Sequence, residues 1–211
     1  MMRAERGHSA FRALVEAIAL GDAPTASQML SASPELAHER SKEGASRHLA
    51  KDHYLDEIEH DLYVGDTALH IAAAAYQKGI AADLIAKGGD VRAKNRHGAE
   101  PIHYAADGVP GSRGWNPRAQ EAMIDCLIKA GADPNAVDKR GVTPLHRAVR
   151  TRCAAAVKAL LAGGANARAG NKNGSSPMLL ASHSTGRGGS GSIEAKAEQQ
   201  EILRLLKAPS S

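Results

Sequence analysis

One short motif recurs four times along this chain, and the recurrence limits the folds that are open to it. The copies are TALH from Thr67, EPIH from Glu100, TPLH from Thr143 and SPML from Ser176. They follow one another at intervals of about 33 residues, apart from one interval of about 43, and a fixed period of this size is typical of stacked repeats. Each unit of such an array packs only against its neighbours, so the sequence predicts a solenoid and not a closed globular fold.

A second element recurs in register with the first. The segments GGDVRA at 88–93, GADPNA at 131–136 and GANAR at 164–168 each precede a turn that contains a glycine. Together the two elements resemble the ankyrin repeat. The run GDTALH at 65–70 and the glycine-rich last repeat are similar to bacterial ankyrin proteins. The resemblance implies an all-α solenoid of about five stacked helix–turn–helix units, joined by short β-hairpin-like turns and ended by atypical capping repeats. It also implies binding of a protein partner, with no catalysis.

The repeats and the segments between them are interpreted as one domain covering residues 1–211. Its parts are a degenerate N-terminal repeat at 9–33, an inserted helical segment at 34–66, repeats at 67–99, 100–142 and 143–175, and a C-terminal repeat at 176–207 with a glycine-rich insertion. Within the inserted segment, Leu55, Ile58 and Leu62 recur at helical spacing and predict a helix from Asp52 to Leu62. A closing helix is expected from about Ile193 to Lys207.

Each motif is interpreted as the start of a helix. Thr143 can cap that helix with its hydroxyl, and Pro144 suits the first helical position, where a missing N–H costs nothing. Glu100 is a weaker cap than threonine, so the third repeat is expected to be held less tightly at that corner. Alanines follow each motif, at 72, 105, 148 and 181. These small side chains predict close packing between neighbouring repeats.

The composition indicates a chain without a membrane-spanning segment. No apolar run approaches the roughly 20 residues that a membrane helix requires, and the N-terminus does not lead into a signal peptide. We therefore expect a cytoplasmic monomer, with Cys126 and Cys153 as free thiols that act as small core residues at helix positions. The net charge of +4 and the pI of about 9.1 favour anionic partners.

The residues expected to bind a partner are the turn tips and the exposed positions of the first helix of each unit. They are Arg96, His97, Tyr104, Lys139, Arg140, Arg147, Arg150 and Lys172, together with Trp115 and Arg187 from two inserted loops. Because arginine pairs with carboxylates through two parallel hydrogen bonds, this surface predicts an acidic protein segment as the partner.

Two further expectations concern this surface. A solvated charged face without any partner is the competing interpretation. Nucleic acid is disfavoured as a partner, because few aromatic side chains are placed to stack on bases and acidic residues are interspersed. Arg147 and Arg150 are treated as surface residues, so their replacement by glutamate is expected to leave thermal unfolding nearly unchanged.

A metal-dependent hydrolase is the main alternative to a binding module. His53, Glu57 and His60 would share one face of the predicted helix, and two imidazoles with a carboxylate can hold zinc or iron. Polar helix faces produce such sets by chance, so we expect no metal and no other cofactor. The motif histidines at 70, 103 and 146 occupy equivalent positions about 10 Å apart and cannot share an ion. They are predicted to bond neighbouring backbone groups.

Two insertions distinguish this chain from a plain array. The first, Val109 to Arg118, holds the one tryptophan, Trp115, which could anchor a partner or pack on the adjacent helix. The second, Gly186 to Ser192, is glycine-rich and precedes a helix, an arrangement that can hold a phosphate. It lacks the P-loop lysine and a preceding strand, so a mobile connector is favoured. The two insertions could meet across the fourth repeat, and a pocket between them is a second possible site for a hydrolase.

Overall fold

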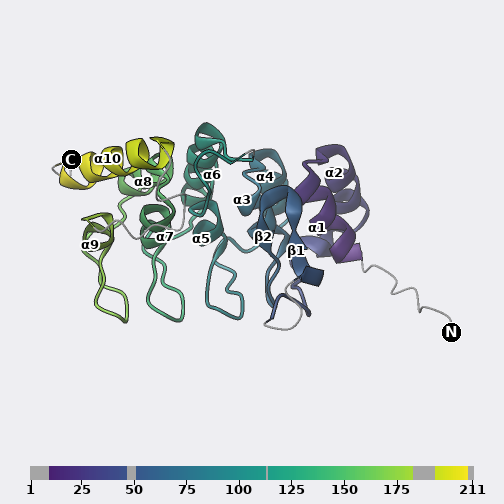
Figure 1. Cartoon of the computed structure of the whole chain (residues 1–211). Helices are drawn as coiled ribbons and strands as arrows, with labels where there is room; N and C mark the ends of the chain where they lie inside the picture. Colours follow the sequence, from purple (N-terminus) through teal and green to yellow (C-terminus); the bar gives the residue numbers. More distant parts are fainter. Residues whose placement is uncertain (1–9, 47–50, 113, 183–192, 209–211) are drawn as a thin grey trace.

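The computed structural model describes residues 10–46, 51–112, 114–182 and 193–208 and arranges their helices in two layers (Figure 1). One layer holds the first helix of each unit: α1 (Ala10–Leu20), α3 (Ala68–Ala74), α5 (Pro101–Ala105), α7 (Pro144–Thr151) and α9 (Pro177–Ser182). The other layer holds the second helices: α2 (Ala23–Ala32), α4 (Lys78–Ala86), α6 (Pro117–Lys129), α8 (Ala154–Ala162) and α10 (Ile193–Lys207). The predicted all-α solenoid is confirmed, and α10 has the expected bounds.

Hairpin-shaped loops project from the array beneath the first helices (Figure 1). Adjacent loops are joined by backbone hydrogen bonds: Arg96 N–H donates to Val64 O, Lys139 N–H to His97 O, and Lys172 N–H to Arg140 O, at 2.9, 2.9 and 3.0 Å. Because each bond links equivalent places in consecutive units, the loops keep the same spacing and direction. Their tips consequently form one continuous edge of the molecule.

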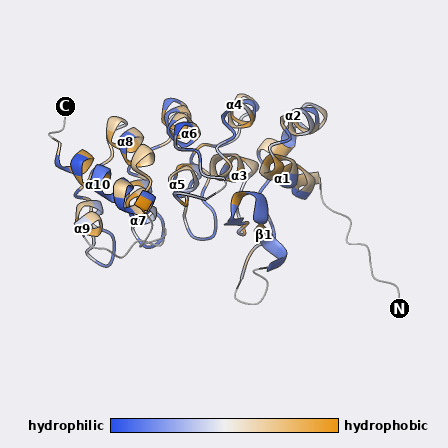
Figure 2. Ribbon diagram, turned by 45° about the horizontal axis from the view of Figure 1, so that its top comes forward, coloured by the Kyte–Doolittle hydropathy of each residue, from blue (hydrophilic) through white to orange (hydrophobic). Residues whose placement is uncertain are grey.

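The core runs between the two helix layers. Leu69, Ile102 and Leu145, the apolar residues of the motifs, are fully buried. The alanines that follow the motifs are buried as predicted, at 72, 105, 148 and 181. Ribbon hydropathy agrees, with apolar residues on the helices and hydrophilic residues around β1 and its hairpin (Figure 2). Among the described residues, no helix combines the length and the apolar character that crossing a bilayer requires.

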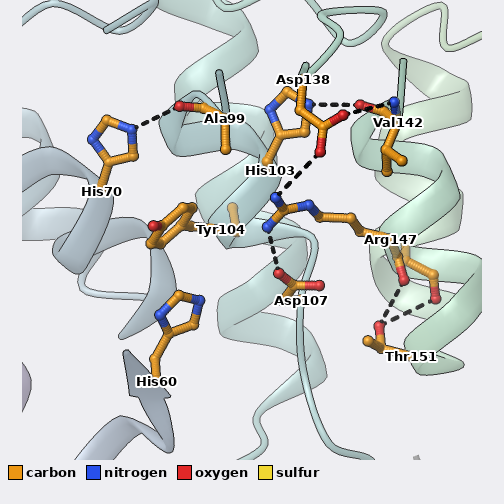
Figure 3. Close-up of polar contacts among 12 residues, drawn as sticks. His60, His70, Ala99, His103, Tyr104, Asp107, Asp138, Val142, Arg147 and Thr151 are labelled. Atoms are coloured by element: carbon orange, nitrogen blue, oxygen red, sulfur yellow. Dashed lines mark hydrogen bonds and ion pairs between the residues drawn. The ribbon is translucent and has the colours of Figure 1, made fainter. Parts of the chain in front are cut away.

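Three buried histidines connect successive units. The Nδ1 atoms of His70, His103 and His146 accept the backbone N–H of the residue that begins their motif, at 3.1, 3.1 and 3.2 Å. Their Nε2 atoms lie 3.1, 3.1 and 2.9 Å from the carbonyl oxygens of Ala99, Val142 and Ser175, each of which directly precedes the motif of the next unit. The first two carbonyl contacts are visible in Figure 3. Nδ1 therefore accepts and Nε2–H donates, which confirms the predicted backbone role. In the third unit the Glu100 N–H donates to His103 Nδ1 in the same way, so the bond from the histidine ring to the start of the helix is kept where glutamate replaces threonine.

The segment before α3 corrects one prediction, because residues 52–62 do not form a helix. The chain forms 3₁₀ turns η2 (Lys51–His53) and η3 (Asp56–Ile58), with a two-stranded hairpin of β1 (Tyr54–Leu55) and β2 (His60–Asp61). Glu59 adopts a left-handed backbone with φ 51° and reverses the chain. Leu55 and Leu62 are both buried, one near each strand. Their helical spacing therefore reflects burial on the two arms of a hairpin. A further 3₁₀ turn, η1 (Pro34–Ala37), follows α2.

The first insertion lies where it was expected, as the loop between α5 and α6. The second insertion, with Arg187, lies outside the described residues, so the predicted meeting of the two loops stays a prediction. Both cysteines are free; Cys153 is buried and lies immediately before α8, where it is the N-terminal capping residue of that helix.

Candidate functional site

A pocket of about 570 Å³ opens on the layer of first helices, and we call it the insertion pocket. The β1–β2 hairpin forms one wall, α7 with the Arg140 turn forms the opposite wall, and the loop between α5 and α6 covers it. The residues that carry charge or hydrogen-bonding groups in its lining include Glu57, Glu59, His60, Asp61, Tyr63, Tyr76, His97, Tyr104, Asp107, Trp115, Arg140, Arg147 and Arg150. A Cβ atom on Gly114 would lie 3.8 Å from the carbonyl oxygen of Glu57, so loop and hairpin approach each other directly.

The floor of the insertion pocket is a buried carboxylate network. The Tyr104 hydroxyl donates to the Asp66 carboxylate at 2.8 Å, and Asn95 Nδ2 and Tyr63 N–H donate to it at 2.9 and 2.7 Å. Asp66 is fully buried and Tyr104 is 1% exposed. Burial and then the Asp66 charge raise the pKa of Tyr104 well above its usual value. Tyr104 was expected on the exposed face, but its long side chain reaches back to Asp66 of the preceding unit, so it supports the site from below.

Arg147 is likewise not a free surface residue. Its Nη1 donates to Asp107 Oδ2 at 2.7 Å, and its Nη2 lies 3.9 Å from Asp138 Oδ2 (Figure 3). Its guanidinium also lies 5.9 Å from the centroid of the Tyr104 ring. Its side chain is only 12% exposed. Burial lowers the pKa of Arg147, but the Asp107 and Asp138 carboxylates outweigh it and the net pKa is raised. The expectation that Arg147 could be reversed without affecting unfolding is therefore wrong, because its charge is part of an inter-repeat ion pair.

The proposed metal ligands are not brought together. His53 belongs to η2, Glu57 to η3 and His60 to β2, and the helix face that was to align them does not exist. His60 instead bonds Asp61 O through Nδ1 at 2.8 Å, and its ring lies 4.4 Å from that of Tyr104. Within the part of the chain that the structure describes, no group of three histidine, cysteine or acidic side chains is placed to hold an ion.

The turn tips carry exposed lysine and arginine side chains and one exposed histidine, whose pKa is lowered by burial and by the charges of Arg96 and Arg140. His97, Lys139, Arg140 and Lys172 are exposed, as predicted for a contact surface. Asp138 turns inward instead, where its carboxylate accepts the backbone N–H groups of Arg140 and Val142 at 2.8 and 3.0 Å. Arg96 is partly buried, donates to Ala45 O and lies 5.4 Å over the Tyr63 ring. The tips therefore expose their positive charges and hide the Asp138 charge.

Trp115 lies in the loop that covers the insertion pocket and is partly buried. Its Nε1 atom is inaccessible to solvent and has no hydrogen-bond partner within the described ranges. A buried N–H without a partner costs about 1–3 kcal/mol, so this donor is available to a ligand that enters the pocket.

Tyr76 braces the same loop and is a residue that sequence reasoning missed. It lies between α3 and α4 in a left-handed conformation, φ 54°, where the first unit has Gly21 with φ 73°. Its hydroxyl donates to Asp107 O, and Gln120 Nε2 donates to that hydroxyl at 3.2 Å. The sequence feature that could have identified Tyr76 is a bulky residue at a turn position that favours glycine.

Replacing Tyr76 with phenylalanine is expected to lower the free energy of unfolding by about 1 kcal/mol, the value of one buried hydrogen bond. The ring keeps its packing, so the loss reports the hydrogen bonds of the hydroxyl to Asp107 and Gln120. Urea denaturation followed by circular dichroism measures it. Tyr54→Phe, at a side chain on the exposed hairpin, is the control and should change stability by less than about 0.5 kcal/mol. Equal effects of the two substitutions would show that Tyr76 does not brace the loop.

Stacked helix pairs linked by hairpin loops define a helical repeat protein. Family models for the ankyrin repeat match residues 64–96 and 97–139, and a model for ankyrin repeats in many copies matches 127–181. The chain belongs to the ankyrin repeat family, whose repeats are protein–protein interaction modules and whose members are generally not enzymes.

Several curated proteins are similar to this chain over its repeats. Ankyrin repeat and SOCS box protein 16 of Mus musculus is 34% identical over 112 residues, which is 53% of this chain and 24% of that protein. Neurogenic locus notch homolog protein 1 of Danio rerio is 34% identical over 118 residues, 56% of this chain and 4% of that protein. B-cell lymphoma 3 protein homolog of Mus musculus is 32% identical over 116 residues, 54% and 25% of the two chains. The match covers no more than a quarter of each of these three relatives.

Proposed function

We propose that this chain is a scaffold or adaptor that recognises an acidic segment of a partner protein through its row of turn tips. The observation that carries the proposal is the exposure of His97, Lys139, Arg140 and Lys172 along one edge. The inter-loop hydrogen bonds hold that edge rigid, so a partner loses little entropy in ordering it. Lysine and arginine on such an edge steer an acidic partner and fix its register.

The proposal treats the chain as a monomer that acts in the cytoplasm without catalysis or nucleic-acid binding. The metal-dependent form of the hydrolase alternative loses its support because its three ligands come from three separate elements. Exposed tip charges alone would also suit a nucleic acid. An acidic protein is favoured because the rings that line the adjacent pocket, such as Tyr104, are buried and unavailable for base stacking.

The combined variant Lys139→Glu, Arg140→Glu, Lys172→Glu tests the proposal. We expect it to fold normally and to bind a captured partner at least about tenfold more weakly, because three attractive charges become repulsive. Partners are captured on the immobilised protein, identified by mass spectrometry, and their affinity is then measured at low and high salt. Surface plasmon resonance with the purified partner gives the comparison.

The matched control reverses three exposed lysines of the second-helix layer, Lys78, Lys129 and Lys196. It has the same net charge as the tip variant and should keep wild-type affinity. Equal losses in both variants would show that net charge, and not the tip edge, attracts the partner. Nuclease treatment before capture tests for nucleic-acid binding. A partner that is no longer captured after this treatment indicates nucleic-acid binding.

A further inference from the structure

The insertion pocket has charges of opposite sign on its facing walls. Glu57, Glu59 and Asp61 come from the hairpin at one side. Arg140 from the third repeat and Arg150 from the fourth repeat lie at the other side, together with Arg147. Asp107 also lines the pocket, but it is paired with Arg147, so the acidic side chains that are not paired with an arginine among the described residues come from the hairpin. Figure 3 shows His60 of the hairpin below Tyr104 and the Arg147 guanidinium of the fourth repeat to the right of Tyr104.

Some of these charges are already used inside the protein. Arg147 pairs with Asp107 at 2.7 Å, and Asp61 accepts the Tyr63 hydroxyl at 3.1 Å. Glu57 and Glu59 have no ion-pair partner among the residues that the structure describes. Both residues are exposed, and both line the insertion pocket. The hairpin wall consequently offers carboxylates to a cation.

The opposite wall and the roof offer donors. Arg140 and Arg150 supply guanidinium groups, which bind a carboxylate with directed N–H bonds. Trp115 adds the buried indole N–H that has no partner within the described ranges. Simple anions fit this pocket poorly, because the three acidic residues of the hairpin wall repel them. Simple cations are repelled by the arginines in the same way.

We propose that the insertion pocket binds a small zwitterionic ligand, a short free peptide or a basic amino acid. Its ammonium end lies against Glu57 and Glu59, and its carboxylate lies against Arg150 and Arg140 beneath the Trp115 indole. The volume of about 570 Å³ is within the range of small-molecule sites. This site overlaps the partner-binding edge at His97 and Arg140 but not at Lys139 and Lys172, which do not line it. The inference does not depend on the proposed scaffold function.

Trp115 is the one tryptophan of the chain, so tryptophan fluorescence can monitor ligand binding in the insertion pocket. Titration of the intact protein with triglycine or with L-lysine should change Trp115 fluorescence saturably, and the two arms distinguish a peptide from an amino acid. N-acetyl-triglycine lacks the ammonium and triglycine amide lacks the carboxylate. Each should bind at least about tenfold more weakly than triglycine, as expected for the loss of a charge-assisted contact. If both capped peptides bind as well as triglycine, or if neither triglycine nor lysine gives a saturable change, the proposal is wrong.

Two variants assign the ends of the ligand. Arg150→Gln should weaken triglycine by about tenfold and leave the already weak amide unchanged, because the lost contact is the carboxylate. The pair Glu57→Gln and Glu59→Gln should weaken triglycine and leave N-acetyl-triglycine unchanged for the corresponding reason.

Lys172→Gln, at a tip outside the pocket, is the matched control and should bind like the wild type. Equal weakening of all ligands by a pocket variant would contradict the assigned orientation. If a variant does not fold, the comparison of capped and free peptides on the wild-type protein still decides the proposal. The double variant Lys139→Glu, Lys172→Glu, at two tips outside the pocket, distinguishes the two sites: weaker partner binding with a retained triglycine response is expected.

Discussion

Arg147→Glu is expected to lower the free energy of unfolding by about 3–5 kcal/mol, the usual cost of breaking a buried ion pair. The new carboxylate would face Asp107, which now bonds the guanidinium at 2.7 Å, and Asp138. Three acidic groups would then share a site in which the arginine side chain is 12% exposed. Because Asp107 lies in the third unit and Arg147 in the fourth, the loss should uncouple neighbouring repeats. Urea denaturation monitored by circular dichroism at neutral pH measures the change.

Arg140→Glu is the matched control for this prediction. It makes the same change of charge on an exposed tip a few residues away, and it should alter stability by less than about 0.5 kcal/mol. A small effect of Arg147→Glu, similar to that of the control, would mean that the inter-repeat ion pair contributes little. The contrast also explains why a reversal at Arg147 is unsuitable as a test of partner binding.

The array itself was predictable because its information is local and repeated. All four copies of the motif mark a helix start, three of them carry a histidine, and glycine turns recur in register, so the copies reinforce a single interpretation. The histidine role also followed from position alone, since equivalent residues in a stack lie too far apart to share an ion. The structure agrees at His70, His103 and His146.

The insertion pocket was not predictable from the same information. Tyr104 and Arg147 occupy positions that point toward the open face of a repeat, but both side chains are long enough to reach carboxylates in the preceding unit. Those carboxylates, Asp66 and Asp107, lie outside any periodic apolar pattern. Their contacts across 38 and 40 residues leave no mark in local sequence spacing.

The hairpin illustrates the limits of short apolar patterns. Three residues at helical spacing were interpreted as a helix, yet Leu55 and Leu62 are buried from the two arms of a turn centred near Glu59. The sequence predicted that Trp115 anchors a partner or packs on the adjacent helix, and it did not indicate that the loop of Trp115 approaches this hairpin. Which insertions meet is decided by the stacking geometry of the whole array.

Acid is expected to destabilise the protein because its motif histidines are buried in the neutral form. Burial, followed by the charge of Arg147, lowers the pKa of His103 from 6.5 to about 4. Burial also lowers the pKa of His70 and His146. Between pH 6.5 and about 4, the unfolded chain therefore binds a proton at His103 more readily than the folded chain does. The stability that neutral His103 contributes is complete above pH 6.5 and is lost as pH falls toward 4. That loss is about 3 kcal/mol for His103 alone.

Chemical denaturation at about pH 7.5 and about pH 4.5 measures this loss in the wild type and in His103→Gln. The variant should be less stable at neutral pH, because the glutamine replaces a ring that bonds the first and the last residue of its repeat at once. It should nevertheless lose less stability on acidification, by about 3 kcal/mol, since it has no proton to take up. His38→Gln, at an exposed histidine, should keep the wild-type difference between the two pH values. If His103→Gln loses as much stability as the wild type, His103 does not cause the acid sensitivity, and the motif histidines support the repeats without setting their response to pH.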